Sequence, residues 1–170
     1  YAALASAYVV LPGYTPEDGD EAQLMPLAET AARRALSIDP KIGEAHAVLA
    51  QMNAQRGDLL DAESGFFFAI SLEPNEATPH HWYSLLLSGV GRVDQALEQA
   101  RRAQELDPSS AVIALNLANM HLMKGENDAA LGYAKRAQQL GLATGIHGVE
   151  AEIAIRRGQW DAARRLIVQQ

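Results

Sequence analysis

Five histidines are the side chains of this sequence best suited to metal binding or acid–base chemistry. His80 and His81 are adjacent, and neighbours on a helix point about 100° apart, so their imidazoles do not converge on one ion. Metal-binding helices place ligands three or four residues apart, and no two histidines have that spacing. The sequence also has no cysteine nucleophile and no glycine-rich phosphate loop. We therefore expect no enzyme, no cofactor and no metal.

Two of the histidines, His46 and His80, lie 34 residues apart and belong to a repeated pattern. Three prolines, each preceded by an acidic residue, recur at the same interval: Pro40, Pro74 and Pro108. Glycines and alanines keep the interval as well: Gly57, Gly91 and Gly125; Ala62, Ala96 and Ala130; Ala35, Ala69, Ala103 and Ala137. This agreement indicates a repeat protein whose histidines at the shared place fill the core rather than ligate metal.

Each recurring residue type predicts a structural role in a pair of helices. The prolines end helices, because proline restricts the preceding residue and has no N–H to donate. The glycines close helix C-termini in the left-handed conformation, and the alanines let two helices approach closely. With 48% hydrophobic but only 6% aromatic residues, the composition also suits closely packed helices. The sequence therefore predicts an all-α fold.

We expect residues 1–170 to form one array of about five helix pairs. The repeats span about 1–42, 43–76, 77–110, 111–143 and 144–170, and the complete pairs are expected at 43–56 and 59–72, 77–90 and 93–106, 111–124 and 127–140, and 144–157 and 160–169. In the first repeat the helix ending at Ile38 is in register, but residues 12–20 are too rich in proline and glycine to be helical. This inserted loop either carries function or is an acidic connector.

The pattern resembles the tetratricopeptide repeat, a 34-residue helix-turn-helix unit. The second repeat matches its signature best, at Leu49, Ala50, Ala62, Phe66, Ala69 and Pro74. The resemblance implies a right-handed α-solenoid of about five such pairs and a scaffold that binds proteins or peptides in its concave groove. A weaker resemblance, in the run from Ala77 to Tyr83 and the long first-repeat loop, is to the repeat regions of bacterial transcriptional regulators and adenylate cyclases.

The family's groove positions fall on side chains able to bind a peptide. We expect the groove to be formed by Gln51, Gln55, His81, Trp82, Leu85, Asn116 and Asn119. Trp82 and Leu85 offer an apolar anchor, although Trp82 could instead pack against the next repeat, and the asparagines can hydrogen-bond a peptide backbone. Val112 and Leu115 occupy places where relatives that bind chaperone C-termini carry lysines, so the chain departs from that carboxylate clamp.

Phe67 and Phe68 break the internal pattern. The other repeats have basic pairs at the equivalent places: Arg33 and Arg34, Arg101 and Arg102, and Lys135 and Arg136. Two phenylalanines in an otherwise charged position predict an apolar patch on the convex face that something covers. The alternatives are self-association into a homo-oligomer, a flanking domain, or the first-repeat loop folding back.

Charge and hydropathy narrow the class of partner. The net charge is −7, and residues 1–76 carry 4 basic against 12 acidic side chains, which argues against nucleic acid. The apolar run at the start is shorter than the roughly 20 residues of a membrane helix, so we expect no membrane contact. We also expect a cytoplasmic location. The leading hypothesis is a non-enzymatic scaffold with a protein or peptide partner. The alternative is the sensory or regulatory region of a bacterial regulator or cyclase.

Overall fold

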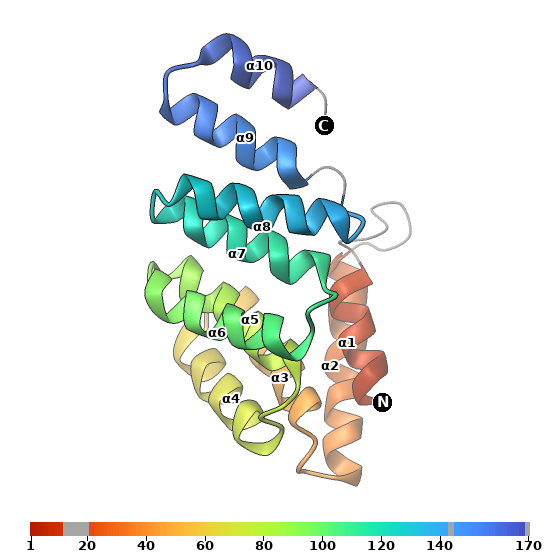
Figure 1. The fold of residues 1–170 in the computed structure, drawn as a ribbon. Coiled ribbons are helices and arrows are strands. Elements are labelled where there is room, and N and C mark those ends of the chain that lie inside the picture. The colour runs from red at the N-terminus through yellow and green to blue at the C-terminus, as the bar shows by residue number, and fades with distance from the viewer. Residues whose placement is uncertain (12–20, 143–144, 169–170) are drawn as a thin grey trace. The chain divides into compact units, whose positions relative to one another are not determined.

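The structure, a computed structural model, describes residues 1–11, 21–142 and 145–168. The inserted loop predicted at 12–20 therefore lies outside the described residues. Within the described part the chain is helical and has no strand (Figure 1), which confirms the all-α prediction. The chain divides into two compact units, Tyr1–Leu86 and Leu87–Gln170. The single array over all 170 residues stays a prediction.

Ten helices are described, and the boundary between the units falls inside the fifth. The first unit contains α1 (Ala2–Val10), α2 (Glu21–Ile38), α3 (Gly43–Arg56), α4 (Leu59–Leu72) and most of α5 (Ala77–Gly89). The second contains the end of α5, then α6 (Val93–Leu106), α7 (Ala111–Met123), α8 (Asn127–Gln139), α9 (Gly145–Arg156) and α10 (Trp160–Val168). From α3 onward each helix begins and ends within one residue of its predicted bounds.

The glycines predicted to end helices do so through their backbone conformation. Gly57 has φ 87° and follows α3, and its amide donates to the Ala54 carbonyl. A Cβ at this position would meet nothing within 4 Å, so the constraint on residue type is the positive φ and not lack of space. Gly91, Gly125 and Gly158 follow the first helix of the later pairs with φ between 70° and 81°, and Gly141, with φ 104°, follows the second helix α8. The short turns that follow fold each helix back onto its predecessor.

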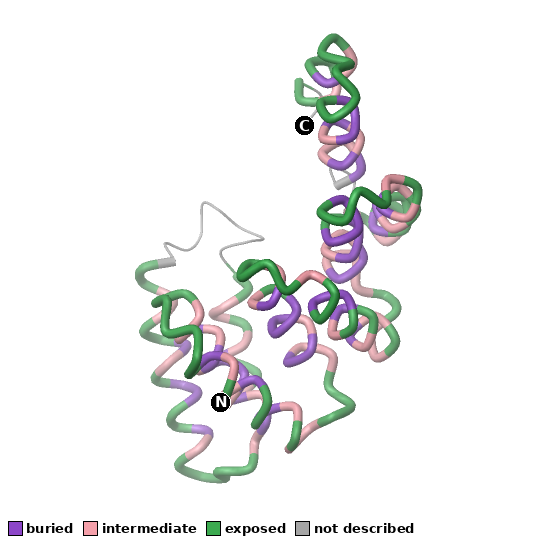
Figure 2. Tube along the Cα trace, turned by 90° about the vertical axis from the view of Figure 1, so that its left-hand side faces the viewer, coloured by how far each residue is buried: buried purple, intermediate pink, exposed green. Residues whose placement is uncertain are grey.

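Alanine and glycine allow α3 and α4 to pack closely in the first unit. A Cβ added to Gly65 of α4 would lie 2.8 Å from the Cβ of Ala50 on α3, a distance that forces one backbone to move. Phe66 is fully buried on the same side of α4, beside buried Ala62 and Ala69. Buried residues follow one side of α4, whereas those of α3 are spread around the helix (Figure 2). The opposite side of α4 is left to solvent.

In the second unit α7, α8 and α9 share one core. Its buried members are Ala118 and Leu122 of α7, Ala130 and Ala134 of α8, and Ile146, Val149 and Ile153 of α9. Small side chains come from α8 and large ones mainly from α7 and α9. This arrangement fills the space between three helices without separating them, as dense interior packing requires. The alanines of the repeated registers are buried here as predicted.

His46 and His80, which share a place in successive repeats, make the same hydrogen bond. The Nε2 atom of His46 lies 2.9 Å from the carbonyl oxygen of Pro40, and that of His80 lies 3.2 Å from the carbonyl oxygen of Pro74. The ring therefore ties the start of one helix to the proline turn before it. His80 is buried, as predicted from the period, whereas His46 is only half-buried.

Candidate functional site

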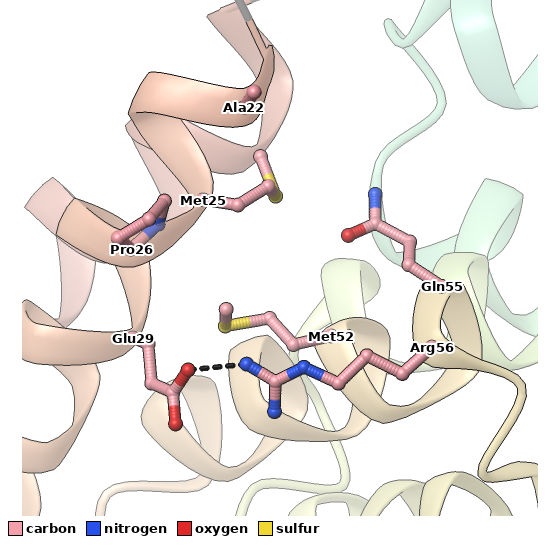
Figure 3. Close-up of a pocket in the computed structure, with 7 residues that line it drawn as sticks. All are labelled: Ala22, Met25, Pro26, Glu29, Met52, Gln55 and Arg56. Carbon is pink, nitrogen blue, oxygen red and sulfur yellow. Dashed lines mark hydrogen bonds and ion pairs between the residues drawn. The ribbon is translucent and has the colours of Figure 1, made fainter.

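A pocket of about 590 Å³ lies between α2 and α3 in the first unit. It is lined by Ala22, Met25, Pro26 and Glu29 of α2 and by Met52, Gln55 and Arg56 of α3 (Figure 3). The side chains of Met25 and Met52 extend from the two helices into the space between them, while Gln55 and Arg56 border it along α3. The volume is within the range typical of ligand pockets, ~300–1,000 Å³.

Helical spacing explains why these residues line one cavity. The α2 residues are at positions i, i+3, i+4 and i+7, and the α3 residues are at i, i+3 and i+4, so each set occupies one helix face. Of the seven, sequence reasoning identified only Gln55. The periodicity of residues 22–29 was a usable signal, but nothing local shows that this face opposes residues 52–56 of α3.

A carboxylate shared by two arginines dominates the electrostatics of the pocket. Glu29 accepts hydrogen bonds from Arg33, at 3.0 and 2.7 Å, and from Arg56 across the gap between the helices. The bonds from Arg33 and then from Arg56 lower the pKa of the Glu29 carboxyl, which keeps it ionised at neutral pH. Two guanidinium groups around one carboxylate leave a net positive charge. Since the Arg56 side chain is still 50% exposed, part of that charge faces solvent at the pocket rim.

Three predicted groove residues lie together on α5, with different exposure. Trp82 is only 4% exposed, His81 is mostly buried, and Leu85 is 37% exposed. Burial lowers the pKa of the His81 imidazole to about 4, so the ring is neutral at physiological pH. Among these three residues, Leu85 therefore offers the largest exposed fraction to a ligand.

The other predicted groove residues fall on two further helices. Gln51 is half-buried on α3, one helical turn before Gln55. Asn116 is half-buried and Asn119 exposed on α7, which belongs to the second unit. The structure thus groups these residues by helix, and one groove that passes through all of them remains a prediction.

Phe67 and Phe68 lie on the outward side of α4, opposite buried Ala62 and Ala69. They are 57% and 49% exposed, so the apolar pair is open to solvent in the chain by itself. That another molecule or segment covers this pair stays a prediction.

No cluster of three or more His, Cys, Asp or Glu side chains able to hold a metal ion occurs among the described residues. Within the same residues, no helix combines the length and apolar character needed to cross a membrane.

Helix pairs joined by short turns, with small residues at the crossings, define an all-α helical repeat protein of the α-solenoid class. The family model for the tetratricopeptide repeat matches residues 84–141. This segment is therefore similar to the tetratricopeptide repeat family, and the solved structures below show the same fold over most of the chain.

Three solved structures have a similar fold. A thermophilic tetratricopeptide repeat protein from Thermus thermophilus aligns with a TM-score of 0.71 and 23% identity, over 86% of this chain and 81% of that one. The pilF protein of Pseudomonas aeruginosa gives 0.69 and 20% over 96% and 73%. MamA gives 0.64 and 16% over 85% and 88%. A search of curated protein sequences found no match.

Proposed function

We propose that the chain is a non-enzymatic scaffold that binds a peptide segment of another protein, and that the pocket between α2 and α3 receives one of its side chains. The fold supports the first part, because tetratricopeptide repeats generally serve as binding scaffolds. The pocket supports the second, because a predicted groove residue, Gln55, borders it.

The chemistry of the pocket selects the kind of side chain. Thioether and ring groups of Met25, Met52 and Pro26 form an apolar lining that adapts to an aliphatic side chain. At the rim the Gln55 amide can donate to and accept from a peptide backbone, and the exposed part of Arg56 attracts a carboxylate. The expected ligand is a segment with a leucine-like or methionine-like residue next to an acidic one.

The remaining groove residues extend this proposal along the chain. Leu85 and Asn119 are exposed and can contact a ligand directly, whereas His81, Gln51 and Asn116 are partly covered. Trp82 remains the predicted apolar anchor of α5, but at 4% exposure its ring meets a ligand only if binding displaces the side chains above it. The partner is proposed to be a protein in the cytoplasm, not nucleic acid, because the net charge of −7 disfavours phosphate.

A pocket-filling substitution tests the site. Peptides are first selected from a random displayed library on the wild-type protein and then synthesised for titration. Ala22→Phe places a ring in the pocket from an exposed position of α2, and we expect it to weaken the selected peptides by about tenfold or more. Gln23→Phe is the matched control, since Gln23 is exposed on the same helix outside the pocket.

Arg56→Gln tests the chemistry. It should reduce the preference for an acidic residue in the peptide while the apolar contact remains. Equal affinity of the wild-type, Ala22→Phe and Gln23→Phe proteins for every selected peptide would refute the proposed site.

The second hypothesis, a sensory or regulatory region of a transcriptional regulator or cyclase, gains no support from the family model or from the three structures described above. We do not favour it.

A further inference from the structure

The outer face of α4 is an apolar surface that the pocket does not use. We define this face as Leu60, Ser64, Phe67, Phe68 and Ser71, which lie at i, i+4, i+7, i+8 and i+11 on one side of the helix. Leu60 is 81% exposed, and both phenylalanines are about half exposed. The buried side of α4, with Ala62, Phe66 and Ala69, faces the core, and of the outer face Phe68 lies at the edge where it still touches α3.

The two serines add little polarity to the outer face of α4. The Ser64 hydroxyl donates to the Leu60 carbonyl at 2.9 Å, and the Ser71 hydroxyl donates to the Phe68 carbonyl at 2.7 Å. Their hydrogens are therefore turned into the backbone of α4 itself. What remains toward solvent is a nearly continuous apolar stripe along the helix.

Neighbouring rings hold both phenylalanines in place. Phe68 packs edge-to-face on His46 of α3, with centroids 4.7 Å apart and planes at 81°. Phe67 packs against Tyr83 of α5 at 5.2 Å, and the Tyr83 hydroxyl donates to Glu63 of α4 at 2.7 Å. Side chains held in this way lose little conformational freedom on binding, which favours their use as anchors.

Unpaired acidic groups adjoin the apolar stripe at the start of α4. Asp58 and Asp61 are exposed, and neither carboxylate has an ion pair or hydrogen bond within the described part of the chain. A shallow depression of about 370 Å³ is lined by residues 57–61, which include both aspartates and Leu60. The unit around them, residues 1–86, carries 4 basic and 12 acidic side chains. A partner that covers the stripe must therefore bring positive charge.

We propose that the outer face of α4 binds a basic amphipathic helix of a partner protein. Apolar side chains of that helix lie along Leu60, Phe67 and Phe68, and a lysine or arginine sits in the depression beside Asp58 and Asp61. Apolar surfaces of this kind bind an amphipathic helix through its side chains at positions i, i+3, i+4 and i+7. This surface is separate from the pocket, so the inference does not depend on the proposed function.

The test uses a fluorescent synthetic helix of leucine and lysine, as long as the 14 residues of α4, with leucine on one face. Binding is followed by fluorescence anisotropy at physiological ionic strength, where exposed charges are screened beyond about 8 Å. A scrambled peptide of the same composition and a leucine–glutamate helix are the probe controls. We expect the leucine–lysine helix alone to bind the wild-type protein.

Variants then locate the contact. Replacing Phe67 and Phe68 with arginine copies Arg101 and Arg102 at the equivalent places of α6, and we expect about a tenfold or greater loss of affinity. Leu60→Gln, at the most exposed position, is a milder second variant, and circular dichroism checks that each protein is folded. Asp58→Asn with Asp61→Asn should weaken binding and reduce its salt dependence. Replacing Arg101 and Arg102 with alanine should change nothing, and neither should Ala22→Phe, which alters only the pocket.

Three results would overturn the inference. The scrambled or leucine–glutamate peptide could bind as well as the leucine–lysine helix, which would reveal unspecific attraction. The arginine variant could retain wild-type affinity, which would place the contact elsewhere. Finally, sedimentation velocity could show self-association of the wild-type protein that the arginine variant loses, and the occupant would then be a second copy of the chain.

Discussion

At the scale of single residues, the histidines show how one side-chain type takes different roles. His80 is buried and bonds to the proline turn before its helix. His147, at the corresponding place of the last repeat once its one-residue shift is allowed, is half-buried; its Nδ1 has no hydrogen bond within the described residues and lies 3.6 Å from the Glu150 carboxylate. The difference arises at the turns, because Gly141 and Leu142 stand where the other repeats have acid and proline. The same repeat position is therefore expected to contribute unequally to stability.

Replacing His80 by alanine measures that contribution. His80→Ala removes a hydrogen bond and leaves a cavity, so we expect it to lower the free energy of unfolding by about 1–3 kcal/mol. Urea denaturation of the variant and of His147→Ala provides the comparison, and the second substitution should cost clearly less. An equal decrease in the free energy of unfolding at both positions would show that the hydrogen bond to the Pro74 carbonyl does not add to stability.

His81 should make stability depend on pH. Its pKa of about 4 in the folded chain lies below the ordinary value of 6.5, so the unfolded chain binds the proton more readily between these values. Stability is then fully present above about pH 6.5 and falls as the pH is lowered toward 4, by about 2 kcal/mol at pH 4.5. The measurement is urea unfolding at pH 7 and 4.5 for the wild-type and His81→Asn proteins. An unchanged pH dependence in the variant would assign the effect to other groups.

At the scale of elements, helix ends are governed by backbone conformation, which local sequence encodes well. From α3 onward the predicted and observed bounds agree within one residue, because the acid–proline turns and the left-handed glycines end these helices through local sterics. The pocket between α2 and α3 could not be predicted in the same way. Its formation depends on which faces of two helices oppose each other, and the Glu29–Arg56 pair spans 27 residues of sequence.

Two glycine substitutions distinguish the effect of a positive φ angle from the effect of low helix propensity. Gly57→Ala forces a positive φ on a residue with a Cβ, so we expect it to destabilise the protein by about 1 kcal/mol. Gly132→Ala lies inside α8, has open space around it and should stabilise by about 0.5–1 kcal/mol. Thermal or urea unfolding distinguishes the two signs. A loss of stability in both variants would argue that α8 needs Gly132 for another reason.

At the scale of the whole molecule, the two compact units and the short-range helix contacts predict that a destabilising substitution loosens only the helices near it. In repeat proteins each element contacts mainly its neighbours, and stability is approximately a sum of local terms. The shared core of α7, α8 and α9 is an example, since its members all come from consecutive helices. A destabilising substitution in that core should therefore loosen these three helices and leave the first unit unaffected.

Ala134→Leu tests this locality. Ala134 is fully buried in the α7–α9 core, and a larger side chain should overpack it at a cost of about 1–3 kcal/mol. Hydrogen exchange followed by mass spectrometry should show faster exchange in α7, α8 and α9, with α1 to α3 unchanged. Uniform acceleration along the whole chain would indicate one cooperative unit instead.

The sequence by itself determined the helix pairs, their period, the glycine turns, the buried alanines and the anomaly at Phe67 and Phe68. These features follow from short-range sterics and hydrogen bonding, which each segment carries with it. Only the tertiary structure decided that Trp82 is buried, that Leu85 is exposed and that residues of α2 and α3 enclose a pocket. Exposure and cavities depend on which side chains of other helices cover a position, and a repeat pattern does not specify that.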